Sequence, residues 1–142
     1  YNLTKLENIG IPNGVTSIGD EAYKYCFSAT SLTFGDSIGT IGKEAFLGDL
    51  KLNAISLPNT VTSIGEGAFQ GITNAKSITI GSGVTEIPAN AFRGAEQCVE
   101  LIIGNGVVSI GDNAFYGMKH IENVTIPPSP NFPTMFLKTP PP

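Results

Sequence analysis

A segment of 23 residues is repeated along the chain without insertion or deletion. The stretch Val61–Phe69, V-T-S-I-G-E-G-A-F, has four near copies, which begin at Val15, Ile38, Val84 and Val107. In every copy the second aliphatic residue, the alanine and the aromatic residue recur at the same 23-residue step. A unit this short cannot bury its own apolar face, so units with a fixed period in the twenties stack and share one core. The period therefore predicts a solenoid.

Four apolar columns run through the repeats, where a column is the set of residues that occupy one position in successive repeats. Two columns pass through Val61 and Ile64, and two others pass through Ile55 and Leu57, two residues apart. Apolar residues that alternate with polar ones are typical of a strand with one face in the core. We therefore expect Ile64 to be buried, and flanking polar residues such as Ser63 to include outward-facing positions.

Each repeat divides into four parts. The first strand ends at a Gly or Pro, since neither residue type prolongs a strand. Turn dipeptides such as Asn105-Gly106 lead into a second short strand, V-T-S-I in most copies. The alanine-aromatic pair then lies on one or two expected helical turns, which close near glycines suited to a left-handed cap, at Gly48, Gly71, Gly94 and Gly117. The predicted coil is strand, turn, short second strand and helical turn, and stacked coils form parallel ladders of short strands.

The repeat resembles a known family pattern, L-x-x-I-x-I-P-x-x-V-T-x-I-G-x-x-A-F. From Leu52 the chain reads L-N-A-I-S-L-P-N-T-V-T-S-I-G-E-G-A-F. This is similar to the BspA-like, or treponemal-type, leucine-rich repeat, and the similarity extends from residue 6 to about residue 126. We therefore expect residues 1–126 to form a leucine-rich repeat solenoid of about five full coils with partial coils at its ends. Residues 127–142 are expected to be a Pro-rich cap or linker.

The resemblance implies a cell-surface or secreted protein that adheres to host matrix proteins or to other cells. Two departures from the family pattern stand out. The cysteine that usually follows the aromatic residue is present only as Cys26, and the sixth coil fails after Ile126, where Pro130 and Pro133 replace the expected Val and Ile.

Charge and composition exclude several classes of function. The net charge is -4 and charged residues make up 14% of the chain, whereas nucleic-acid binding needs clustered Lys and Arg. We expect no nucleic-acid partner. No apolar run reaches the roughly 18 residues of a membrane span, so no membrane insertion is expected. Tyr1 falls in the middle of a repeat, which favours a processed chain or a piece of a longer one.

Residues suited to catalysis or metal binding are scarce. The single histidine, His120, occupies a column whose other members are polar, so we expect a solvated side chain rather than a catalytic or metal-binding one. The acids near the expected helical turns, Asp20, Glu21, Glu44, Glu66 and Asp112, are interpreted as helix-capping groups. Each coil offers only one or two carboxylates, too few for a calcium site. We expect a protein that is not an enzyme and has no cofactor.

The two cysteines are three coils and three residues apart. At about 4.8 Å per stacked strand, Cys26 and Cys98 would lie about 14 Å apart along the axis, beyond the ~7 Å limit for a disulfide. We expect free, buried thiols. The sequons at Asn2 and Asn123 mark two candidate glycosylation sites, although the Asn, Ser and Thr content would produce about as many by chance.

The tail from Pro127 holds seven of the ten prolines. P-P-S-P-N-F-P and T-P-P-P predict an extended, polyproline-like segment. One interpretation is that Phe132, Met135, Phe136 and Leu137 fold over the exposed end of the core. The alternative is a docking peptide for a partner.

The outward ladders of the first strand are the remaining candidate site. Small polar side chains dominate them, and such sheet faces bind other macromolecules in repeat proteins. We predict ligand-binding residues at Ser77, Thr79, Glu100, Ile102, Asn123 and Thr125. Glu100 and the exposed apolar Ile102 are the expected hot spot, because they interrupt otherwise neutral or polar ladders. The alternative for Ile102 is a strand-forming residue tolerated at the surface.

These observations predict a surface-displayed adhesion or protein-interaction module, located outside the cell or on its surface. Its partner would be a protein or cell-surface ligand such as an extracellular matrix protein. The alternative is a structural building block, in which solenoids self-associate into a filament or cell coat. A building block would self-associate with micromolar affinity, whereas an adhesin would stay monomeric until its ligand is added.

Overall fold

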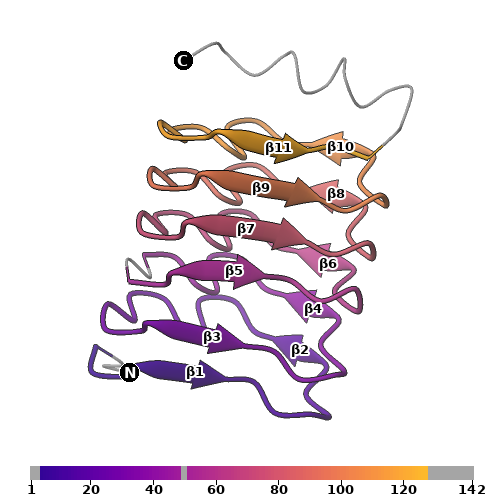
Figure 1. Ribbon diagram of the computed structural model, residues 1–142. Coiled ribbons are helices and arrows are strands. Elements are labelled where there is room, and N and C mark those ends of the chain that lie inside the picture. The colour runs from indigo at the N-terminus through magenta and orange to yellow at the C-terminus, as the bar shows by residue number, and fades with distance from the viewer. Residues whose placement is uncertain (1–3, 49–50, 128–142) are drawn as a thin grey trace.

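The computed structural model describes residues 4–48 and 51–127, and these form a stack of flat coils (Figure 1). Each coil contributes a first strand of three or four residues, and most contribute a second strand of two residues. The first strands are β1 (Asn8–Gly10), β3 (Ser31–Thr33), β5 (Ala54–Ser56), β7 (Ser77–Ile80), β9 (Glu100–Ile103) and β11 (Asn123–Thr125). The second strands are β2 (Ser17–Ile18), β4 (Thr40–Ile41), β6 (Ser63–Ile64), β8 (Glu86–Ile87) and β10 (Ser109–Ile110).

The first strands form parallel ladders in which each residue pairs with the residue 23 positions away. Ile55 pairs with Ile78, and Ile78 pairs with Leu101. One sheet has the order β11-β9-β7-β5, and β1 pairs with β3 in a second sheet. The predicted solenoid with 23-residue coils and parallel ladders of short strands is therefore confirmed.

The second strands form a ladder with one break, at Pro88. In the other coils a glycine follows the second strand, and its N–H donates to the isoleucine carbonyl of the preceding coil, as Gly65 does to Ile41 at 2.8 Å and Gly111 to Ile87 at 2.7 Å. Pro88 has no N–H to donate to Ile64. Sheets β2-β4-β6 and β8-β10 are separate for this reason.

The third side of each coil is a series of turns, and the helical turn expected there does not form within the described residues. A helix needs each N–H to bond four residues back along the same chain segment. Here alternate N–H groups bond to the next coil instead, such as Tyr23 to Ala45 at 2.7 Å and Phe69 to Ala91 at 2.8 Å. The backbone also becomes left-handed two residues before each aromatic, at Glu21, Glu44, Gly67, Asn90 and Asn113.

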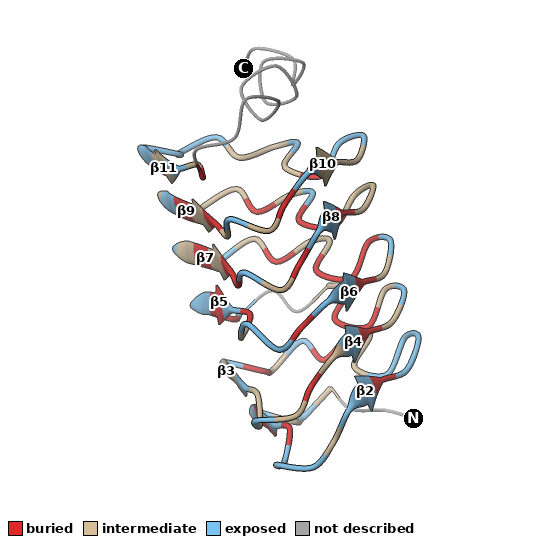
Figure 2. Cartoon of the chain, turned by 90° about the vertical axis from the view of Figure 1, so that its right-hand side faces the viewer, coloured by how far each residue is buried: buried red, intermediate tan, exposed pale blue. Residues whose placement is uncertain are grey.

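The core lies between the three sides, as the buried segments in Figure 2 show. One aromatic ring per coil stacks on the next at centroid distances of 5.1–5.7 Å, in the order Tyr23, Phe46, Phe69, Phe92 and Phe115. Ile64 is buried, and Ser63 beside it is exposed. The predicted register of the second strand is therefore confirmed.

Both cysteines are buried within this core. The Cys98 thiol is free, so the expected absence of a Cys26–Cys98 disulfide is confirmed. Its Sγ lies 3.2 Å from the Glu100 carbonyl, to which it donates a hydrogen bond. Burial raises the pKa of the Cys98 thiol, because the thiolate would lose its hydration.

The solenoid is described up to Pro127, whose side chain is buried. The cap or linker predicted for the Pro-rich tail falls on residues 128–142, outside the described residues, and the sequon residue Asn2 does so as well. Across 4–48 and 51–127, no helix has the length and apolar character that crossing a membrane requires.

Candidate interaction surface

The six residues predicted to bind a ligand lie together on three adjacent strands. Ser77 and Asn123 both pair with Glu100, and Thr79 and Thr125 both pair with Ile102. The six side chains thus form two short rows across β7, β9 and β11, which we call the ladder face. They come from segments 23 residues apart in the sequence, brought together by the repeat alone.

Strand alternation directs these side chains outward. In β9 the buried positions are Leu101 and Ile103, while Glu100 is exposed and Ile102 is half-buried. Because successive side chains of a strand point to opposite faces, burial of Leu101 and Ile103 in the core directs Glu100 and Ile102 to the outer face. The apolar columns of the core therefore position the ladder face.

The expected exposure of Ile102 needs a correction. Its side chain is half-buried, as is that of its strand neighbour Thr79, whereas Glu100, Asn123 and Thr125 are exposed. Ile102 lies between Thr79 and Thr125 in its row, and side chains one strand apart are close enough to cover one another. The ladder face therefore offers a partly covered apolar group beside an exposed carboxylate.

The polar groups of the ladder face have no partners among the described residues. None of the six side chains forms a hydrogen bond or ion pair with another residue of 4–48 or 51–127. The same column differs at its N-terminal end, because Ser31 Oγ donates to Asn8 Oδ1 at 2.7 Å across β1 and β3. The ladder face thus presents hydroxyl, amide and carboxylate groups that can bond to a ligand.

The sequon at Asn123 belongs to the same surface. Asn123 and Thr125 are both exposed, so the position is accessible to modification. A glycan there would lie beside Glu100, because Asn123 and Glu100 pair across β11 and β9. Glycosylation at Asn123 stays a prediction.

The acids interpreted as helix caps act differently, because no helix forms at their positions. Asp20 Oδ1 accepts the N–H of Lys43 in the next coil at 2.8 Å. Glu44 and Glu21 hold Lys24, with Oε2 of Glu44 at 2.7 Å and Oε1 of Glu21 at 3.4 Å from its Nζ. The hydrogen bond between Lys24 and Glu44 raises the pKa of the lysine and lowers the pKa of the glutamate.

His120 is exposed, as the polar character of its column predicts. Its Nδ1 lies 2.8 Å from the Glu96 carbonyl of the preceding coil. Over 4–48 and 51–127, no three His, Cys, Asp or Glu side chains gather in a way that could hold a metal ion.

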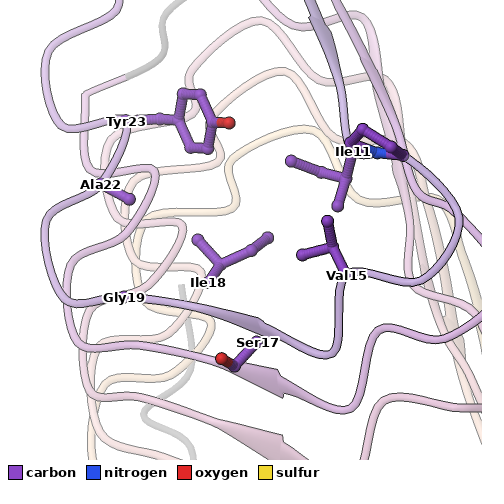
Figure 3. A pocket seen from close by; sticks show the side chains of 8 residues that line it. Ile11, Val15, Ser17, Ile18, Gly19, Ala22 and Tyr23 are labelled. Carbon is purple, nitrogen blue, oxygen red and sulfur yellow. The ribbon is translucent and has the colours of Figure 1, made fainter.

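The first coil borders an open hollow of about 390 Å³. Ile11, Val15, Ile18 and Tyr23 point into it (Figure 3), and these are the core columns of the first coil. No His, Cys, Asp or Glu lines it. The hollow is thus the inner surface of the first coil and carries no acid, base or nucleophile apart from the Ser17 and Tyr23 hydroxyls.

An exposed aromatic pair is absent from the sequence-based predictions. Tyr25 and Phe27 are 49% and 43% exposed, and their rings lie 5.6 Å apart. The signal in the sequence is a break in a column: Tyr25 occupies the position held by Gly48, Gly71, Gly94 and Gly117 in the other coils. A bulky residue in a glycine column marks a surface that differs from its neighbours.

Comparison with known proteins supports the fold and the family. A model of the BspA-type leucine-rich repeat region matches in six copies, over residues 1–98 and 40–134. No curated protein matches the sequence.

Several solved structures are similar, and three of them are leucine-rich proteins. The chain is 28% identical to a leucine-rich repeat protein of T. pallidum, with a TM-score of 0.79 over 96% of this chain and 61% of that one. It is 26% identical to a leucine-rich repeat protein of Bacteroides ovatus, with a TM-score of 0.80 over 87% of this chain and 32% of that one. It is 26% identical to a leucine-rich cell surface protein of Faecalibacterium prausnitzii, with a TM-score of 0.57 over 86% of this chain and 42% of that one.

The chain thus spans less than two thirds of the length of each of these proteins. The family model covers nearly the whole sequence, and its repeat is the unit seen in each coil of the structure. The chain belongs to the BspA-type leucine-rich repeat family.

Proposed function

We propose that the chain is a non-enzymatic interaction module, displayed on the cell surface or outside the cell, that binds a macromolecular ligand through the ladder face. The observation that carries the proposal is the set of polar side chains on β7, β9 and β11 without partners among the described residues. A ligand can bond to these groups without breaking existing contacts. One structural relative is named a cell surface protein, which supports the proposed location.

Adhesion to matrix proteins is the specific form of this proposal. A flat sheet face suits a protein ligand better than a small molecule, because small ligands need a concave pocket that covers most of their surface. The ladder face is rigid, since each of its strands is hydrogen-bonded to a neighbour. A rigid face loses little conformational entropy on binding.

The experiment is a binding assay on immobilised fibronectin, laminin and collagen. Thr79→Arg and Thr125→Arg introduce bulk and charge at outward positions of the ladder face, and should abolish binding. Thr85→Arg is the matched control, because Thr85 is exposed and precedes β8, away from the first-strand sheet. Binding that survives both ladder-face changes in folded protein would refute the proposed site.

Two further variants test the hot spot. Glu100→Ser and Ile102→Thr introduce residue types found elsewhere in the same columns, so the fold should be kept. If the fifth coil is the anchor, each change should weaken binding at least tenfold, since a few central residues dominate most interfaces. Unchanged affinity would place the binding energy on other residues.

The alternative function is a building block that self-associates. The apolar hollow of the first coil favours it, because Ile11, Val15 and Ile18 would pack against another coil as the same columns do inside the stack. Sedimentation velocity over a range of concentrations distinguishes the two functions. A building block forms larger species that Val15→Asp in the hollow dissociates, whereas an adhesin forms none that depend on this hollow.

A further inference from the structure

Tyr25 has a backbone conformation that favours glycine. Its φ is 62°, and the equivalent glycines of the other coils have φ values of 82–89°. The local hydrogen bond is also the same in both coils. The N–H of Phe27 donates to the Tyr25 carbonyl at 2.9 Å, as the N–H of Thr73 donates to the Gly71 carbonyl at 2.9 Å. A left-handed conformation is unfavourable for a residue other than glycine. The first coil nevertheless has a tyrosine here, and this residue is 49% exposed.

The second coil makes room for the Tyr25 ring. A Cβ at Gly48 would lie 2.9 Å from Cδ1 of Tyr25, which is too close, and 3.8 Å from Cε1 of Phe27, which is an ordinary contact. Glycine at this position therefore lets the Tyr25 ring lie over the neighbouring coil beside that of Phe27. Tyr25 and Phe27 therefore form a continuous aromatic surface, which we call the aromatic patch.

The aromatic patch has an acidic border. Lys24 lies 5.4 Å from the centroid of the Tyr25 ring, but it is held between two carboxylates, Glu21 and Glu44. Lys43 also acts on Glu44, so the four charges balance, and the carboxylate that is open to a partner is that of Glu21. Glu21 is the more open of the two acids, with 60% of its side chain exposed.

The chain itself contains a segment of complementary chemistry. Residues 128–142 include six prolines, and their only charged residue is Lys138, which is followed by T-P-P-P. Proline-rich segments in the polyproline II conformation bind to exposed aromatic surfaces, because they are already extended and lose little entropy. Because a polyproline II helix repeats every three residues, Lys138 and Pro141 would lie on one side of a tail bound in this conformation. A proline ring on the aromatic patch would then place Lys138 near the acidic border.

We propose that the aromatic patch of one molecule binds the proline-rich tail, residues 128–142, of a second copy of the chain. The contact joins the first coil of one molecule to the C-terminal end of another. It is therefore heterologous and extends into a chain of molecules unless the rotation closes a ring. This interaction is independent of the ladder face, which lies on β7, β9 and β11, whereas Tyr25 and Phe27 lie in turns of the first coil.

Sedimentation velocity of the full chain tests the proposal directly. We expect association that increases with protein concentration and is reversed by an excess of free peptide with the sequence of residues 128–142. Tyr25→Gly and Phe27→Thr introduce residue types found in the same columns, so folding should be kept, and each should weaken association at least tenfold. Tyr116→Gln is the control, because Tyr116 is 56% exposed and Gln70 occupies its column.

A labelled tail peptide supplies the second measurement. Saturable binding to the full chain is expected, with a tenfold loss for the peptide that carries Lys138→Glu and a weaker affinity at high salt. Association that is unaffected by Tyr25→Gly, or a peptide that does not bind, would overturn the proposal. Matrix binding by the Tyr25→Gly variant should be unchanged, so failure of this inference is distinguishable from failure of the proposed function.

Discussion

At the scale of single residues, the glycines after β4, β6 and β10 are required by the neighbouring coil. A Cβ at Gly65 would lie 2.3 Å from the Lys43 nitrogen, and a Cβ at Gly111 would lie 2.4 Å from the Ala89 nitrogen. Both contacts are with backbone, which cannot move without disturbing the ladder. At Gly19, in the first coil, a Cβ would meet nothing within 4 Å.

The pair Gly65→Ala and Gly19→Ala tests this requirement. We expect Gly65→Ala to destabilise the protein by about 1–3 kcal/mol, the usual cost of overpacking. Gly19→Ala should be neutral or stabilising by up to about 1 kcal/mol, because alanine restricts the unfolded chain. Urea unfolding measures both. Equal losses would mean that backbone conformation, rather than the approach of the neighbouring coil, selects glycine in this column.

Cys98 gives the stability a pH dependence. Burial raises the pKa of its thiol in the folded protein, whereas the unfolded thiol titrates near its ordinary value of about 8.5. The folded state therefore keeps a proton that the unfolded state loses. The resulting contribution to stability is present below about pH 8.5 and is lost as the pH rises towards the folded pKa, at no more than about 1.4 kcal/mol per pH unit.

Cys98→Ala is the matched variant, since Ala75 and Ala29 occupy the same column. The free energy of unfolding, measured from pH 7 to pH 9.5, should fall more steeply for the native chain than for this variant. Parallel slopes would show that other groups, and not the buried thiol, govern the alkaline loss of stability.

The left-handed backbone at Glu21 and Glu44 shows where residue patterns stop being informative. Their column also contains Gly67, Asn90 and Asn113, which are residue types that tolerate positive φ. The two glutamates favour a helix by propensity, and together with the alanine-aromatic pair they lead to the expected helical turn. Hydrogen bonds to the next coil outweigh that preference, and such bonds are not visible within a single repeat.

At the scale of the elements, the strands follow from the alternation of apolar and polar residues. The ends of the strands and their pairing follow from the 23-residue period, because the same position of each coil lies in the same ladder. The break between β6 and β8 could also be foreseen, since Pro88 is the only non-glycine in its column from residue 19 to residue 111. The sequence also placed the six residues of the ladder face on the outer side of the sheet, but it could not identify a ligand, because repeated positions report the core and not the partner. Ligand binding by this face stays a proposal.

Ile64→Ala and Ser63→Ala test the register of β6. Ile64 is 6% exposed, and loss of a large buried aliphatic side chain typically costs about 2–5 kcal/mol. Ser63 is exposed, and its change to alanine should alter the free energy of unfolding by less than about 0.5 kcal/mol. Denaturant midpoints compare the two. Similar small effects would place Ile64 on the outer face and would contradict the register.

At the scale of the whole molecule, the breaks in the ladders are staggered. The first-strand ladder is interrupted between β3 and β5, where β4 and β6 remain paired. The second-strand ladder is interrupted at Pro88, where β5 and β7 remain paired and the N–H of Phe69 still bonds to the Ala91 carbonyl. Each of these two junctions therefore keeps at least two hydrogen-bonded sides and a stacked pair of aromatic rings.

The two thiols can show whether the coils unfold together, because they lie on opposite sides of both junctions. Cys26 belongs to the first coil and Cys98 follows Pro88, and both are buried. In a repeat array each coil is stabilised by its neighbours, so strong junctions couple distant coils and weak ones divide the array into independently unfolding segments. With two bonded sides at each break, we expect Cys26 and Cys98 to become reactive in the same transition. The reactivity of each thiol can be measured by labelling with a thiol reagent along a urea gradient, followed by mass spectrometry of the two peptides. A Cys26 midpoint well below that of Cys98 would show that the first coils unfold on their own.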